Sequence, residues 1–152
     1  MKIKHFLLTI PLMWATCSLA ASPVGYWKTI DDATGKPKAI IKITEEPDKT
    51  LVGHILKILS TDAENKTCNA CQGENHNKPL IGLQVLKDHV LNKSHTDEWI
   101  NGSILDPKNG KTYHCNIRLV DAGRKLNVRG FLGLPLFGRT QTWVKLTEPE
   151  LA

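Results

Sequence analysis

The chain has 152 residues, a formal net charge of +5 at pH 7 and 41% hydrophobic residues. This length allows one domain with a sizeable core. The charge is too mild to indicate a nucleic-acid partner, because no stretch gathers Lys or Arg into a patch interleaved with aromatic residues. Beyond the N-terminal stretch, no apolar segment is long enough to cross a membrane.

The N-terminal stretch has the three parts of a secretory signal peptide. Two lysines form a positive start, an apolar run covers residues 6–15, and the small-x-small site Ser18-Leu19-Ala20 follows. The predicted signal peptide is therefore 1–20, which leaves 21–152 as one exported domain, periplasmic or secreted, in a bacterial envelope. Its removal lowers the net charge from +5 to +3. Lipoprotein processing at Cys17 is the alternative.

Turn signals recur about every ten residues after this leader, and β-rich runs fill the gaps between them. Strands are predicted at 24–30, 39–46, 51–59, 79–86, 99–105, 111–120, 125–131 and 139–146. The run at 79–86 is also compatible with a short helix that reaches Val90, but a strand is favoured. Residues 60–78 are predicted to form a long polar loop, 88–97 a polar connection and 133–138 an apolar loop.

The clearest hairpin is centred on Asn109-Gly110, a pair that readily adopts the positive φ angles of a hairpin turn. Its second arm, 111–120, alternates Tyr113, Cys115 and Ile117 on one face with polar residues on the other. Period-two alternation with one polar face indicates a half-buried antiparallel strand.

Eight strands joined mostly by short turns predict an all-β, antiparallel, up-and-down barrel, since closure removes both sheet edges. The first strand, which carries Gly25 and Trp27, would then pair with the last. A two-sheet sandwich is the alternative, because turn spacing alone does not separate the two. A barrel of this size is either filled by side chains or holds one small ligand.

Several motifs resemble those of a known family of exported bacterial domains of unknown function, number 2147, with a lipocalin-like (calycin) barrel. They are Gly25-Tyr26-Trp27, Cys68-x-x-Cys71, 78–83 (Lys-Pro-Leu-Ile-Gly-Leu), 104–107 (Ile-Leu-Asp-Pro), 109–113 (Asn-Gly-Lys-Thr-Tyr), Val128-Arg129-Gly130 and 139–143 (Arg-Thr-Gln-Thr-Trp). In the lipocalin pattern, an arginine on the last strand lies across the tryptophan of the first. The resemblance thus implies that Gly25, Trp27 and Arg139 close one end of the barrel. It implies no established activity.

Three cysteines remain after the leader: Cys68, Cys71 and Cys115. In an oxidising compartment they are candidates for a disulfide, either Cys68–Cys71 or one of these two to Cys115. A metal site with His76 as a further ligand and a redox-active Cys-x-x-Cys are the alternatives. A buried inert thiol at Cys115 is equally compatible with its position on the apolar face.

The residues select no catalytic constellation and no cofactor, so we do not predict an enzyme. The histidines His54, His89, His95 and His114 share no spacing, which indicates surface positions.

The predicted function is binding of a small apolar or amphipathic molecule, with a structural or protein-interaction module as the alternative. Candidate ligand-binding residues are Tyr113, Ile117, Leu126, Arg129, Leu134 and Phe137, with Arg129 or a tyrosine orienting a polar group. The apolar residues among them would equally fill a solid core. The segment 134–137 is also compatible with an exposed patch for a partner or a membrane surface.

Overall fold

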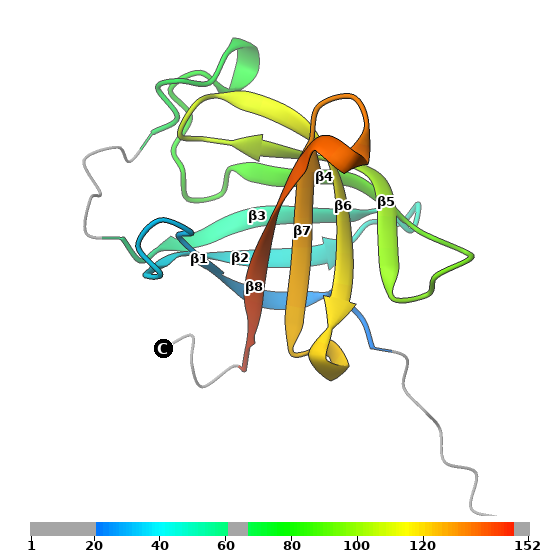
Figure 1. The fold of residues 1–152 in the computed structure, drawn as a ribbon. Coiled ribbons are helices and arrows are strands. Elements are labelled where there is room, and N and C mark those ends of the chain that lie inside the picture. The colour runs from blue at the N-terminus through cyan, green and yellow to red at the C-terminus, as the bar shows by residue number, and fades with distance from the viewer. Residues whose placement is uncertain (1–20, 61–66, 148–152) are drawn as a thin grey trace, which may run out of the picture.

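The computed structural model describes residues 21–60 and 67–147, which form eight strands and three short 3-10 helices (Figure 1). The strands are β1 (Gly25–Ile30), β2 (Pro37–Glu45), β3 (Leu51–Ile58), β4 (Gln84–Leu91), β5 (Glu98–Asp106), β6 (Lys111–Val120), β7 (Lys125–Phe131) and β8 (Gly138–Leu146). The 3-10 helices are η1 (Gly73–Asn75), η2 (Asp121–Gly123) and η3 (Pro135–Phe137). The predicted signal peptide, with Cys17, lies outside these residues.

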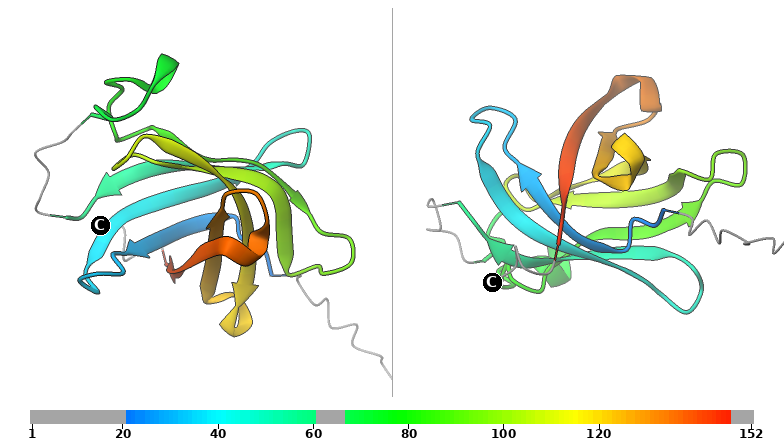
Figure 2. Two further views of the ribbon diagram at one scale, coloured as in Figure 1. Left: turned by 45° about the horizontal axis from the view of Figure 1, so that its top comes forward. Right: turned by 90° about the horizontal axis from the view of Figure 1, so that it is seen from below.

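Each strand pairs antiparallel with the next, and β8 returns to pair with β1, so the sheet is a closed barrel (Figure 2). The closing seam aligns Trp27 with Lys145, and Lys28 with Val144. The predicted all-β, up-and-down barrel is therefore confirmed, and the sandwich alternative is excluded. Among the described residues, no helix has the length and apolar character needed to cross a membrane.

Up-and-down topology places the loops after odd-numbered strands at one end of the barrel. We call this end, formed by the β1–β2, β3–β4, β5–β6 and β7–β8 loops, the odd-loop end, and the opposite end the Trp27 end. Trp27 is fully buried there, and its Nε1 donates a hydrogen bond to the Pro23 carbonyl at 2.7 Å.

The residue that covers Trp27 is Lys145, whose Nζ lies 5.5 Å from the centroid of the indole ring. Arg139 belongs to the odd-loop end instead, where its guanidinium contacts Asp32 at 2.5 Å. The implied closure by Arg139 is therefore wrong. The physical reason is the register between β1 and β8, which pairs Trp27 with Lys145. Lys145 lies near the end of β8, whereas Arg139 lies near its start.

Strand β4 begins later and ends later than predicted, at Gln84–Leu91 rather than 79–86. Its middle is irregular: Asp88 has φ 59°, and Asn101 in the neighbouring strand β5 has φ 62°. These left-handed residues shift the alternation of side chains, so His89 points inward and is fully buried. The run from 88 onward therefore looks polar in sequence although it continues the strand.

The middle of the barrel is filled by side chains. Ile117 and Leu126 are 0% exposed, which leaves no water-sized space beside them. Where the inner wall has a glycine, a large neighbour occupies the room: a Cβ on Gly53 would lie 3.0 Å from Leu86. Small and large residues thus interlock to form a solid core at this level.

Candidate functional site

Three of the predicted ligand-binding residues lie on the inner face of the barrel. Ile117 and Leu126 belong to the filled core. Tyr113 is half-buried nearer the odd-loop end, and its hydroxyl accepts a hydrogen bond from Asn109 Nδ2 at 3.0 Å. These side chains therefore contribute mainly to packing and to the β5–β6 hairpin.

The other three lie on the outside. Arg129 lies between the inward-facing Val128 and Gly130, so its side chain leaves the outer face of β7. Its guanidinium donates to the carbonyls of Pro135 at 2.8 Å and Leu136 at 3.2 Å, and to Thr140 Oγ1 at 2.9 Å. Arg129 therefore fixes the β7–β8 loop and does not point into the barrel.

The β7–β8 loop, which is the orange segment beyond β7 in Figure 1, exposes four large apolar side chains. Their exposed fractions are 63% for Leu132, 65% for Leu134, 78% for Leu136 and 75% for Phe137. We call residues 132–137 the apolar tip. The structure thus separates Leu134 and Phe137 from the inner-face residues, and the six predicted residues do not surround one cavity.

A groove of about 330 Å³ lies on the outer face of β5–β7, beside the base of the apolar tip. Its lining residues are Ile100, Asn101, Gly102, His114, Asn116, Phe131, Gly133 and Pro135. The rings of His114 and Phe131 stack at 5.7 Å, with 30° between their planes. We call this feature the outer groove. It combines apolar surface with two amides and an imidazole, and no carboxylate belongs to its lining.

Sequence reasoning missed the outer groove, although it placed His114 and Asn116 on the polar face of their strand. The signal that could have found it is an aromatic residue directly across the sheet from a histidine, Phe131 opposite His114. A second hollow of about 450 Å³ lies at the β2–β3 turn, where Glu46, Asp48 and Asp88 contribute carboxylates.

The core contains polar atoms without partners. Both ring nitrogens of His89 and the Nε1 of Trp143 are buried and make no hydrogen bond within the described residues. Burial lowers the pKa of His89 to about 4, which the nearby Asp88 carboxylate opposes only in part. His89 is therefore a neutral core residue at pH 7, and the prediction of a surface position is wrong for it because of the bulge at Asp88.

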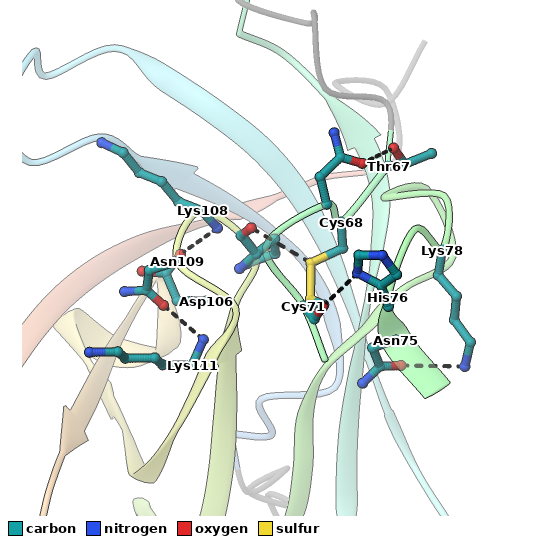
Figure 3. Close-up of a disulfide and its surroundings, with 12 residues drawn as sticks. Thr67, Cys68, Cys71, Asn75, His76, Lys78, Asp106, Lys108, Asn109 and Lys111 are labelled. Atoms are coloured by element: carbon teal, nitrogen blue, oxygen red, sulfur yellow. Dashed lines mark hydrogen bonds between the residues drawn. A yellow bond between two sulfur atoms is a disulfide. The ribbon is translucent and has the colours of Figure 1, made fainter. Parts of the chain in front are cut away.

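The cysteine alternatives are decided in favour of the local bond. Cys68 and Cys71 form a disulfide with a Cα–Cα distance of 5.3 Å (Figure 3). Cys115 is a free, buried thiol, and burial raises its pKa to about 12. Because Cys68 and Cys71 are bonded to each other, neither is a thiolate ligand in this form. The described residues contain no group of three or more His, Cys, Asp or Glu side chains arranged to hold a metal.

The segment closed by the disulfide packs against the tip of the β5–β6 hairpin. Both sulfur-bearing residues are buried, and a Cβ on Gly110 would lie 1.9 Å from the Ala70 carbonyl oxygen. Figure 3 shows the disulfide segment beside Lys108, Asn109 and the rest of this hairpin. The His76 ring Nδ1 lies 2.9 Å from the Cys71 carbonyl oxygen. We call residues 67–83 the cap loop, because it covers one side of the odd-loop end.

The closed eight-stranded, up-and-down barrel is a lipocalin-like fold. The chain belongs to the family described as "Uncharacterized protein conserved in bacteria (DUF2147)", whose model matches residues 25–145. Among solved structures, it is similar to the protein HP1028 from the human pathogen Helicobacter pylori, which is assigned to the lipocalin family. The TM-score is 0.72 at 18% identity, over 86% of this chain and 87% of that one. No curated protein sequence matches significantly.

Proposed function

We propose that this protein binds a small amphipathic molecule and that the outer groove is the binding site. The observation that carries the proposal is the composition of the groove. It offers the apolar surfaces of Ile100 and Phe131 beside polar groups from Asn101, His114 and Asn116. Small-molecule sites combine apolar surface with a few convergent polar groups, and about 330 Å³ lies at the small end of their usual size range.

The filled core argues for an outer site over an inner one. The fully buried Ile117 and Leu126 occupy the middle of the barrel, and a ligand there would have to displace them. The amide and imidazole groups of the outer groove donate hydrogen bonds, and its lining has no carboxylate. These groups favour a ligand whose polar end is neutral or anionic.

We also propose that the protein works outside the cytoplasm. The signal-like residues 1–20 and the Cys68–Cys71 disulfide support this location, since stable disulfides are typical of oxidising compartments.

The test uses 1-anilinonaphthalene-8-sulfonate, an amphipathic anion whose fluorescence rises in apolar sites. Asn116→Glu places a carboxylate in the outer groove and should weaken binding of this probe at least several-fold. Thr112→Glu is the matched control, because it makes the same charge change on the same face of β6, outside the groove lining. It should bind the probe like the wild type. Equal binding by both variants would refute the outer groove as the site.

A further inference from the structure

The apolar tip also points to an interaction that the outer groove does not explain. Leu132, Leu134, Leu136 and Phe137 lie within six residues of chain, and each is more than 60% exposed. Scattered apolar residues are normal on a protein surface, but a contiguous exposed cluster marks a site of interaction. None of these four side chains lines the outer groove.

Several backbone carbonyls of the apolar tip already accept hydrogen bonds from within the protein. The Arg129 guanidinium binds the carbonyls of Pro135 and Leu136, and the Phe137 N–H donates to the Leu134 carbonyl at 3.1 Å. A polar group that is already hydrogen-bonded costs far less to bury than an unpaired one. These hydrogen bonds hold the loop in one arrangement. They also lower the free-energy cost of moving the apolar tip into an apolar medium, because these three carbonyls need not lose hydrogen bonds to water.

The charges of the odd-loop end indicate the sign of the partner. Its described loops, together with up to two adjoining strand residues, are residues 31–38, 57–60, 67–83, 106–111 and 132–139. They hold seven basic residues and four acidic ones, and the basic excess lies at the strand ends. The corresponding loops and strand ends of the Trp27 end, residues 45–50, 91–98, 120–125 and 145–147, hold five basic residues and six acidic ones. Among the described residues, the end that carries the apolar tip is therefore the more basic of the two.

We propose that the apolar tip anchors the protein on an anionic lipid bilayer, with the odd-loop end facing the headgroups. A bilayer accommodates a convex apolar projection, and anionic headgroups attract basic residues near the surface. A second copy of the chain fits less well, because a contact between two tips would bring two basic ends together. This proposal is independent of ligand binding in the outer groove.

The experiment is cosedimentation of the purified protein with vesicles. Vesicles of phosphatidylglycerol and phosphatidylethanolamine should bind the wild type, and vesicles of phosphatidylcholine alone should bind it more weakly. The double variant Leu136→Ser/Phe137→Ser should lose affinity for the anionic vesicles by at least about tenfold. The control Leu56→Ser/Val90→Ser removes two apolar side chains of 43% and 45% exposure on β3 and β4 and should bind like the wild type.

Three results would overturn the proposal: no binding of the wild type to anionic vesicles, equal loss in both double variants, or a dimer in sedimentation equilibrium that the tip variant abolishes. The last result would assign the tip to a second copy of the chain. Thermal unfolding checks that the tip variant remains folded. Its binding of 1-anilinonaphthalene-8-sulfonate, which should be unchanged, separates this proposal from the outer groove.

Discussion

At the scale of single residues, His89 is the most informative side chain of the core. It is fully buried on the inner face, and the Gly102 backbone lies directly beside its ring: a Cβ at Gly102 would be 2.3 Å from it. A glycine is therefore required opposite His89, and the imidazole is held where water does not reach its nitrogens. Within the described part of the chain, the charge that acts on a protonated His89 ring is that of Asp88, which is largely exposed.

We expect the stability of the protein to fall between pH 6.5 and about 4. The pKa of His89 is lowered from 6.5 to about 4 in the folded state, because burial disfavours the charged ring. Below pH 6.5 the unfolded chain therefore binds a proton that the folded chain does not, which favours unfolding by up to about 3 kcal/mol. Urea unfolding at pH 7, 5.5 and 4.5 measures this loss.

The variant His89→Leu should flatten that pH dependence. The carboxyl groups whose pKa values hydrogen bonds lower below 3.8, Asp31, Asp48 and Asp121, titrate beneath this window and do not obscure it. An unchanged slope in His89→Leu would show that another group is responsible.

Gly110 is required for a different reason, which is close approach of the cap loop. Its φ of 70° opposes a side chain, and so does the Ala70 carbonyl oxygen, which would lie 1.9 Å from a Cβ at this position. Gly35 has a similar φ of 68° but open space around it. We expect Gly110→Ala to destabilise by about 2 kcal/mol more than Gly35→Ala, since both variants strain the backbone and only the first displaces the cap loop. Equal losses in urea unfolding would contradict docking of this loop.

At the scale of elements, Arg129 connects strand β7 with the β7–β8 loop. We expect Arg129→Ala to speed amide hydrogen exchange in residues 132–137 and to cost about 1 kcal/mol, because the freed carbonyls are exposed and can bind water. Arg118→Ala is the matched control: it removes an ion pair with Asp97 from the neighbouring strand. Hydrogen exchange followed by mass spectrometry should show no change in residues 132–137 of the Arg118→Ala control. Faster exchange of these residues in both variants would refute the inference that Arg129 specifically holds the β7–β8 loop.

The elements also show where sequence patterns stop being informative. Strand β6 is predictable to its boundaries because its alternation is regular and Asn109-Gly110 marks the turn before it. Strand β4 is misplaced by the sequence pattern because a left-handed Asp88 interrupts the alternation, and no residue type announces that bulge. The same interruption hides the burial of His89. The outer groove escapes prediction because it depends on how a loop folds back over a sheet, which strand patterns do not describe.

At the scale of the whole molecule, closure of the barrel could be predicted but its fine register could not. Eight strands joined mostly by short turns favour a closed sheet, because closure leaves no sheet edge exposed. The observed sheet is closed. Which basic residue covers Trp27 depends on the offset between β1 and β8. Arg139 and Lys145 lie six positions apart on β8, so an offset of six residues would exchange one for the other, and the sequence contains no signal for that offset.

The closing seam makes one prediction for the molecule as a whole. Trp27 is fully buried where β1 meets β8, so Trp27→Ala should destabilise by about 3–5 kcal/mol through lost packing and a cavity at the closed end. Arg139→Ala should cost less than about 1 kcal/mol, because its ion pair with Asp32 leaves the arginine side chain 72% exposed. Guanidinium unfolding measures both variants. A large loss in Arg139→Ala, comparable to that of Trp27→Ala, would place the arginine back in the closure of the barrel and contradict the observed register.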